Sequence, residues 1–480
     1  MPFCALNSEA FRARVFRSHR GRDSAGGAPP SHREMAREGM FEKIAFVSDN
    51  PGTTFAEVSA VVAAFVVATW LRVSAESYFA ESTSRSVRIA LDWVFSVLPS
   101  LACVFATEFA TSVAVVAGSA CALKRVGATV SVGAPSVSKE MYLSAVTLYR
   151  FTLTMLTVVA ILAIDFTPFP RRLGKTETYG VSLMDIGSGS YVFSSGLVSR
   201  FARGERRRSL TKSTRKVLPL IVLGLARLAI TKAVGYHLIE SEYGRHWNFF
   251  FTLAGVNLMA DALPIREGMA IPLGCLVSFA YQCALSVGQL NEWILESPSS
   301  RQHPVEPLYA FVSMNREGFF SVVGYYAIHL LASGIGRVLL TTLSAQRTTS
   351  VGWTVSAFSM CLVAWSTALV LHSYVERVSR RMANAAYVAW VSAYNLQVVV
   401  AFVFILLISF RKASSSFQIP RLCRAVSDKQ LIVFLVGNLL TGVVNMSCDT
   451  LAVNPLHAWV IMLAYIGCIS ATAIRAMNVV

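Results

Sequence analysis

The sequence is dominated by apolar runs that are long enough to cross a membrane. A helix needs roughly 17 to 25 mostly apolar residues to span a bilayer, and ten runs meet this requirement. Apolar residues make up 54% of the chain and charged residues 15%, against about 25% charged in soluble proteins. The sequence therefore predicts an all-α polytopic membrane protein. The ten runs are 57–73, 141–164, 217–235, 248–264, 268–288, 318–340, 349–371, 387–409, 431–447 and 457–478.

Two further segments set the expected span count. The run 180–198 is weaker, and the stretch 88–121 is too long for one span and short for two. We therefore expect a bundle of 12 or 13 transmembrane helices. Asp92 lies within the second stretch, and we expect it to sit near a helix end if the segment breaks around Pro99.

The net charge of +16 comes mostly from Lys and Arg residues in loops beside the predicted spans. It does not indicate a nucleic-acid-binding surface. Eight Lys or Arg lie between Arg200 and Lys216, and five lie between Arg411 and Lys429. By the positive-inside rule both loops are expected in the cytosol, and no nucleic-acid partner is expected. The first loop either attracts phosphates or anionic lipid headgroups, or acts as a topology signal. Counting spans outward places the polar loops on the opposite, lumenal side: 165–179, 236–247, 290–317, 372–386 and 448–456.

The densest polar stretch of the chain follows the run 141–164. Asp165 stands where the apolar helix ends, and Pro168 and Pro170 prevent the helix from continuing. Basic residues follow, and a second Asp lies inside the next apolar segment. Charges at membrane level are costly and usually mark a functional site. The charged side chains of this stretch are Asp165, Arg171, Arg172, Lys175 and Asp185.

Two later groups combine polar and aromatic residues beside predicted spans. Glu242 and His246 share a face if their segment is helical, and Asn248 follows them; interfacial anchoring is the alternative. Asn315, Arg316 and Glu317 precede the run 318–340. They either bind sugar hydroxyls and phosphate oxygens, or start a helix with Asn315 as the cap.

Four stretches in order resemble one known family. They are DFTPFPRRLGKTETYGVSLMDIGSGSYVFSSG from Asp165, EYGRHWNFFFTLA from Glu242, NREGFFSVVGYYAIHLL from Asn315 and GNLLTGVVNMSCDT from Gly437. Together they resemble the glucosaminyl-phosphatidylinositol inositol acyltransferases, the class W enzymes of GPI-anchor synthesis. The resemblance runs from Phe41 to the C-terminus.

The resemblance implies a reaction and its participants. It implies an O-acyltransferase of the endoplasmic reticulum membrane that moves a fatty acyl group, usually palmitoyl, from acyl-CoA to the inositol 2-hydroxyl of glucosaminyl-phosphatidylinositol. Acyl-CoA is then a co-substrate, membrane lipids are partners, and no cofactor or metal is expected.

Such a transfer needs a base, a group that stabilises the oxyanion, and phosphate-binding groups. We assign Asp165 as the base and Lys175 as the residue that tunes it and stabilises the oxyanion or a phosphate. Transfer through an acyl-enzyme on Ser or Cys is the disfavoured alternative. The expected substrate-binding residues are Arg171, Arg172, Asp185, Glu242, His246, Asn248, Asn315, Arg316 and Glu317.

Other interpretations concern single features of the chain. The basic residues 1–40 are expected to form a disordered extension, or the native chain begins at Met35 or Met40, leaving 41–480 as one transmembrane acyltransferase domain. The nine cysteines are expected to be buried thiols. His329, inside a predicted span, is a weak catalytic candidate.

A secondary transporter of a lipid or anionic metabolite is the alternative function, since such carriers share intramembrane charges and glycine-interrupted helices. A non-catalytic scaffold is the third possible function.

Overall fold

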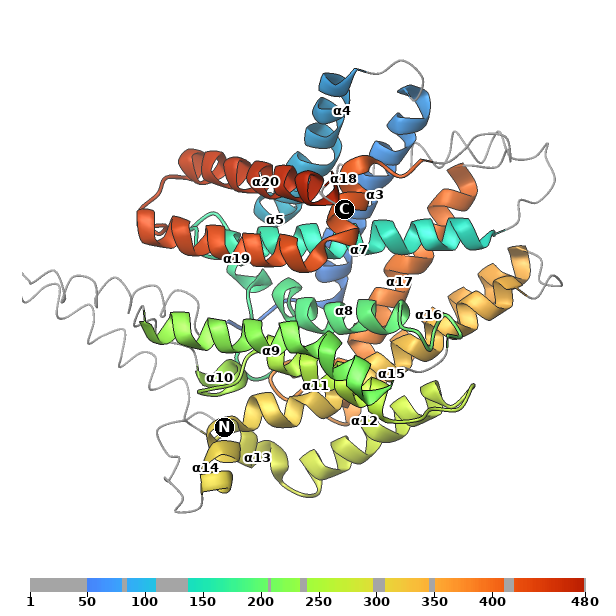
Figure 1. Ribbon diagram of the computed structural model, residues 1–480, viewed down its shortest axis with the longest axis vertical. Coiled ribbons are helices and arrows are strands. Elements are labelled where there is room, and N and C mark those ends of the chain that lie inside the picture. Colours follow the sequence, from blue (N-terminus) through green and yellow to red (C-terminus); the bar gives the residue numbers. More distant parts are fainter. Residues whose placement is uncertain are drawn as a thin grey trace, which may run out of the picture. The chain divides into compact units, whose positions relative to one another are not determined.

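The described part of the chain folds into helices joined by loops, as the apolar runs require (Figure 1). The computed structural model describes residues 50–79, 84–108, 137–205, 209–233, 240–296, 307–344, 350–409 and 418–478. No strand occurs in those ranges. The helices are α3 (Phe55–Phe79), α4 (Arg85–Asp92), η1 (Trp93–Val97), α5 (Leu98–Phe105), α7 (Lys139–Ala163), η2 (Arg171–Leu173), α8 (Leu183–Leu197), α9 (Leu210–Ala233), α10 (Glu240–Tyr243), α11 (Phe249–Ala262), α12 (Ala270–Ser286), α13 (Leu290–Leu295), α14 (Pro307–Met314), α15 (Arg316–Ser344), α16 (Ser350–Tyr374), α17 (Ala385–Ser409), α18 (Arg421–Asp428), α19 (Gln430–Ser447) and α20 (Pro455–Asn478).

The predicted apolar runs are helical wherever the structure describes them. Eight helices of that part of the chain are long and apolar enough to cross a membrane, and α11 and α12 are shorter apolar helices. The weaker run forms α8, which has 15 residues. The protein is thus a multi-pass membrane protein, as predicted. Residues 109–121 of the ambiguous stretch and the extension 1–40 lie outside the described residues.

The first part of the ambiguous stretch differs from the expectation. The helix does not break at Pro99: α4 continues through the π-helical turn η1 into α5, and Pro99 lies in the first turn of α5. A wider π turn before a proline tolerates its missing N–H. Asp92 is therefore not at a free helix end. Its carboxylate accepts a 2.7 Å hydrogen bond from buried Arg72 of α3.

Helix α8 is held between other helices by its glycines. It packs against α7, α15 and α17. A Cβ at Gly189 would lie 2.7 Å from Val391 of α17, and one at Gly196 would lie 2.6 Å from the carbonyl oxygen of His329 in α15. Only glycine permits these close approaches between helices.

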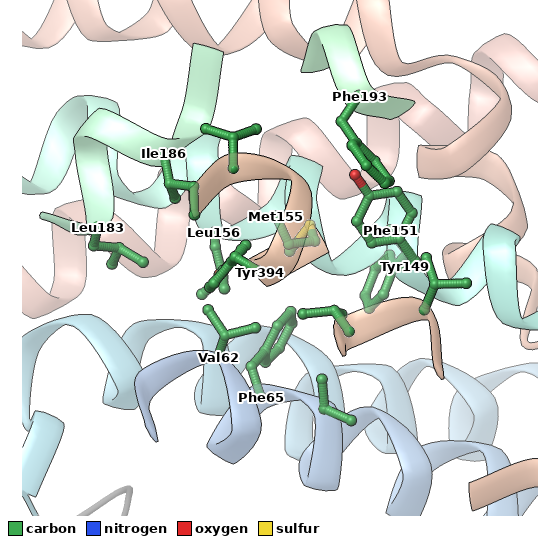
Figure 2. Close-up of a cluster of buried hydrophobic side chains, with 14 of the residues drawn as sticks. Val62, Phe65, Tyr149, Phe151, Met155, Leu156, Leu183, Ile186, Phe193 and Tyr394 are labelled. Atoms are coloured by element: carbon green, nitrogen blue, oxygen red, sulfur yellow. The ribbon is translucent and has the colours of Figure 1, made fainter. Parts of the chain in front are cut away.

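The core around α8 is apolar. Figure 2 shows Val62 and Phe65 of α3 pointing towards side chains of α7 and α8, with Tyr394 of α17 beside Leu156. Phe65 is fully buried. Val62, Leu156 and Tyr394 also line a cavity, so the apolar core forms part of the wall of the candidate site.

Candidate active site

Three loops that the charge pattern assigns to one side of the membrane meet in a cluster of charges. Lys175, from the loop after α7, donates a 2.7 Å hydrogen bond to Glu242 of α10. Arg380, from the loop between α16 and α17, lies 3.8 Å from the same Glu242 oxygen and donates a 2.8 Å hydrogen bond to Asp185 of α8. The four residues Lys175, Glu242, Arg380 and Asp185 are called the charge cluster below.

Glu242 is held in its ionised form. Burial by itself raises the pKa of its carboxyl, but Lys175 and Arg380 more than offset this and lower the pKa to about 2. The same contacts act on Arg380: burial alone lowers the pKa of its guanidinium, while Glu242 and Asp185 raise it above its ordinary value. Glu242 and Arg380 are therefore both charged at neutral pH.

Asp185 occupies the buried end of the cluster. Its side chain is fully buried and accepts hydrogen bonds from the backbone N–H and hydroxyl of Thr176, from the hydroxyl of Ser182 and from Arg380. Ser182 in turn caps α8. These contacts fix the loop 176–182 and Arg380 to the start of α8. Asp185 therefore stabilises the site without lining the first cavity.

The charge cluster lies at one end of a cavity of about 240 Å³. Lys175, Glu242 and Arg380 line it together with Arg227 of α9 and Tyr243. Most of its remaining wall is apolar and comes from α3, α7, α8, α11, α17 and α19. Gly187 also lines it, and a Cβ there would meet only Thr157 Oγ1, at 3.9 Å. The cavity thus joins an apolar interior to a charged end.

A second cavity, of about 520 Å³, adjoins the first. Tyr191, Phe249 and Phe434 line both, and the rings of Tyr191 and Phe434 lie 5.8 Å apart, edge to face. The second cavity is lined by polar residues from the two basic loops and from several helices, α7 and α11 among them. They include Arg150, Arg200, Arg203, Lys216, Asp261, Asp428 and Gln430. A thin aromatic wall therefore separates a mainly apolar cavity from one rich in cations.

Asp165 lies just beyond the first cavity. It follows Ile164, whose side chain lines that cavity, and its carboxylate accepts a 2.8 Å hydrogen bond from Asn445 of α19. The carboxylate that Lys175 binds is Glu242 and not Asp165. Nine residues, with two prolines and the short helix η2 among them, separate Asp165 from Lys175 along the sequence.

Two of the expected substrate-binding residues, Arg171 and Arg172, lie on the exposed side of this loop. Arg171 and Arg172 are both exposed. Arg172 donates a 2.8 Å hydrogen bond to Glu57 of α3 and lies 3.7 Å from Glu108. Neither arginine lines either cavity.

The second motif joins three helices. Asn248 caps α11 by accepting a hydrogen bond from the backbone N–H of Phe250, and it donates one to the carbonyl of Gly224 in α9. The backbone N–H of His246 donates to the side chain of Asn315 at 2.7 Å. These two residues thus position the segment that carries Glu242.

Arg316 and Glu317 are buried at the start of α15. Arg316 donates two 3.0 Å hydrogen bonds to Glu296 and lies 4.9 Å above the ring of Trp293. Glu317 accepts a 2.8 Å hydrogen bond from Arg381. Both residues join α15 to neighbouring segments and do not line either cavity.

The sequence reasoning missed several site residues. Arg380 and Arg381 were counted as loop charges, although two consecutive arginines beside an apolar run were a usable signal. Ser188 is one of the serines of the disfavoured acyl-enzyme alternative, and it lines the first cavity, 2.8 Å from the hydroxyl of Tyr325 and 3.2 Å from that of Tyr387. The two tyrosines gave no local pattern in the sequence.

His329 lies in α15 and lines the second cavity. Its side chain is buried, and its Nδ1 has no hydrogen-bond partner among the described residues. His329 does not line the first cavity, where Lys175, Glu242 and Arg380 lie. Among the described residues, no group of three His, Cys, Asp or Glu could hold a metal ion.

Comparison with known proteins identifies the family. The sequence model of the family described as GWT1 matches residues 41–476. A "GPI-anchored wall transfer protein 1" of Aspergillus oryzae is 38% identical over 369 residues, which cover 68% of this chain and 71% of that protein. The "Phosphatidylinositol-glycan biosynthesis class W protein" of Dictyostelium discoideum is 30% identical over 478 residues, covering 88% and 94%. An uncharacterised protein of Arabidopsis thaliana is 36% identical over 328 residues, covering 68% and 72%. The resemblance carried by the four motifs is confirmed, and the chain belongs to the GWT1 family.

Proposed function

We propose that this protein acylates the inositol ring in GPI-anchor biosynthesis, transferring a fatty acyl group from acyl-CoA to the 2-hydroxyl of glucosaminyl-phosphatidylinositol. The observation that carries the proposal is the first cavity: an apolar chamber within the helices that ends at Lys175, Glu242 and Arg380. A hydrocarbon chain is stable in the apolar part, and a reacting ester group can meet charges at the other end. Membership of the GWT1 family supports the same activity.

The second cavity supports acyl-CoA as the donor. Its cations Arg150, Arg200, Arg203 and Lys216 suit the phosphates of a nucleotide, and they lie in or beside the loops expected in the cytosol. In this proposal the CoA group lies there, and its acyl chain passes Tyr191 and Phe434 into the first cavity. No cofactor enters the scheme.

The acceptor hydroxyl attacks the thioester carbonyl carbon directly. Asp165 takes the hydroxyl proton, and the ammonium of Lys175 stabilises the negative oxygen that forms on the carbonyl. The carbon–sulfur bond then breaks, the ester remains on inositol, and the CoA thiolate takes a proton, so that acid and base are restored. Glu242 is a poor base, because a carboxyl with a pKa of about 2 holds a proton too weakly. Its role is to position Lys175.

The remaining predicted residues have supporting roles in this scheme. Asp185, Asn248, Asn315, Arg316 and Glu317 keep the loops of the charge cluster in place through the hydrogen bonds described above. We assign the exposed Arg171 and Arg172, together with His246, to contacts with a large polar headgroup that approaches from the lumen of the endoplasmic reticulum, the compartment we propose.

The test uses the purified full-length protein in detergent with labelled palmitoyl-CoA and glucosaminyl-phosphatidylinositol. The proposal expects a lipid product that gains one acyl group and releases one CoA. A transporter would move the lipid between the two sides of a proteoliposome without forming an ester, and a scaffold would do neither. Either result would reject the proposal.

A further inference from the structure

Arg227 of α9 is a cation that the mechanism does not use. It lines the first cavity beside Lys175 and Glu242, and it is one of the cations that lower the pKa of Glu242. Its carbonyl accepts a hydrogen bond from Thr231. Within the described part of the chain its guanidinium forms no hydrogen bond or ion pair. Arg227 is an exposed residue overall, so its guanidinium is accessible to an anionic group that enters the cavity.

Arg227 is the cation of this cavity that the charge cluster leaves without a carboxylate. Lys175 is paired with Glu242, and Arg380 is paired with Asp185. Glu242 and Asp185 are thus both bound by other cations, and the Arg227 guanidinium can bind an anion of the substrate. The phosphodiester of a phosphatidylinositol carries one negative charge, and a guanidinium binds phosphate oxygens in a planar, two-pronged geometry.

The position of Arg227 is fixed by the site itself. Asn248 of α11 donates a 3.0 Å hydrogen bond to the carbonyl of Gly224, one helical turn before Arg227. A Cβ at Gly224 would lie 2.5 Å from the ring of Phe251, so α9 and α11 are in close contact there. The guanidinium is therefore presented to the cavity by a helix that cannot easily shift.

Helix α19 contributes to the wall of the first cavity and has open space beside Gly442. Asn438, Gly442 and Asn445 recur at helical spacing and share one face of α19. Asn438 lines the first cavity, and Asn445 binds Asp165, about 10 Å further along the helix. A Cβ at Gly442, between them, would meet no described atom within 4 Å. Helix α19 packs against α7 and α20, whereas α9 packs against α11, and Figure 1 shows α9 and α19 on either side of α8 in this view.

We propose that Arg227 binds the phosphodiester of the lipid acceptor and that the acceptor's hydrocarbon chains leave the cavity between α9 and α19, across Gly442. This inference rests on the proposed function, because it assigns a subsite to the acceptor of that reaction. The phosphate of a phosphatidylinositol lies between its chains and its inositol ring, so binding at Arg227 puts the ring towards Lys175 and Asp165 and the chains towards the membrane.

The first experiment measures KM and kcat of the full-length protein for three acceptors: glucosaminyl-phosphatidylinositol, its deacylated glycerol derivative, and phosphate-free glucosaminyl-inositol. Arg227→Gln is expected to raise KM for both phosphate-bearing acceptors by about tenfold or more, the effect of losing a hydrogen bond to a charged group. KM for the phosphate-free acceptor and for palmitoyl-CoA should not change. Arg227→Lys should recover part of the loss. Lys232→Gln, an exposed change on the same helix outside the cavity lining, is the matched control.

The second experiment tests the path of the chains. Gly442→Phe should lower kcat/KM for the long-chain acceptor and leave the deacylated acceptor unaffected, because open space receives the new ring without displacing other atoms. Val443→Phe, at the next exposed position, is the control and should change neither value.

Each other outcome overturns part of the inference. If Arg227→Gln raises KM for palmitoyl-CoA instead, the guanidinium binds a CoA phosphate. If it raises KM equally for the phosphate-free acceptor, Arg227 has a structural role. If Gly442→Phe affects all acceptors equally or none, the chains leave elsewhere. Failure of the unaltered protein to acylate any of the three acceptors would reject the proposed function itself.

Discussion

Lys175 donates a hydrogen bond of 2.7 Å to Glu242, which lies 67 residues further along the chain. This contact joins the loop after α7 to α10 and places an ammonium group at the end of the apolar cavity. Lys175 keeps two further N–H donors, because an ammonium has three. The pair therefore orients a cation that can still bind a developing oxyanion.

The first prediction concerns this pair. Lys175→Ala should lower kcat by about 10²–10³, the usual effect of losing one oxyanion donor, and Glu242→Gln should lower it less, since the ammonium remains but is poorly held. The double variant should lose less than the product of the two separate losses, because the residues act as a unit. Steady-state kinetics measures this coupling. Independent, multiplicative losses would show that Glu242 does not position Lys175.

The second prediction concerns pH. The pKa of Glu242 is about 2 in the folded protein against an ordinary 4.5, so the folded state binds fewer protons than the unfolded state. The stabilising contribution of the carboxylate is complete above pH 4.5 and is lost as the pH falls towards 2. The difference in melting temperature between the unaltered protein and Glu242→Gln should therefore shrink over that range. An equal difference at pH 7 and pH 3 would contradict the assignment.

The third prediction concerns Asp185. We expected it to bind substrate, but its side chain is buried and does not line the first cavity. Removing one partner of a buried ion pair costs about 3–5 kcal/mol, so Asp185→Asn should lower the melting temperature and the folded yield in detergent. Glu177→Gln makes the same chemical change at an exposed position of the preceding loop and serves as the control. Normal stability of Asp185→Asn combined with a raised KM for the acceptor would restore a direct binding role.

The sequence predicted the helices better than the site. Long apolar runs determine spans because the hydrocarbon interior of a membrane requires the backbone to form its hydrogen bonds internally. Asp185 and Glu242 were found because charges in apolar surroundings are rare. Their partner Arg380 was not, since its contacts depend on how a distant loop folds back. Asp92 is a second example. Its expected position at a helix end was based on Pro99, and that proline carries no information about the ion pair that Asp92 forms with Arg72.

The fourth prediction concerns the N-terminal residues. The family match begins at residue 41, so a chain that starts at Met40 should insert into membranes and keep its activity. Localisation and turnover of the shortened protein, compared with the full chain, measure this. A correctly localised but inactive shortened chain, with activity restored in the full chain, would show that residues 1–39 contribute to function.

The most direct test of the account is formation of the acylated lipid by the purified protein and its Asp165 variant. Mass spectrometry follows the transfer of palmitoyl from palmitoyl-CoA to glucosaminyl-phosphatidylinositol and places the new ester on the inositol ring by fragmentation. The unaltered protein should form this product, Lys232→Gln should form it at the same rate, and Asp165→Asn should lose about 10²–10⁴ in rate, the range for general-base catalysis, while still binding palmitoyl-CoA. No acylated product from the unaltered protein would contradict the proposed reaction, and Asp165→Asn retaining more than about a tenth of the rate would show that Asp165 is not its base.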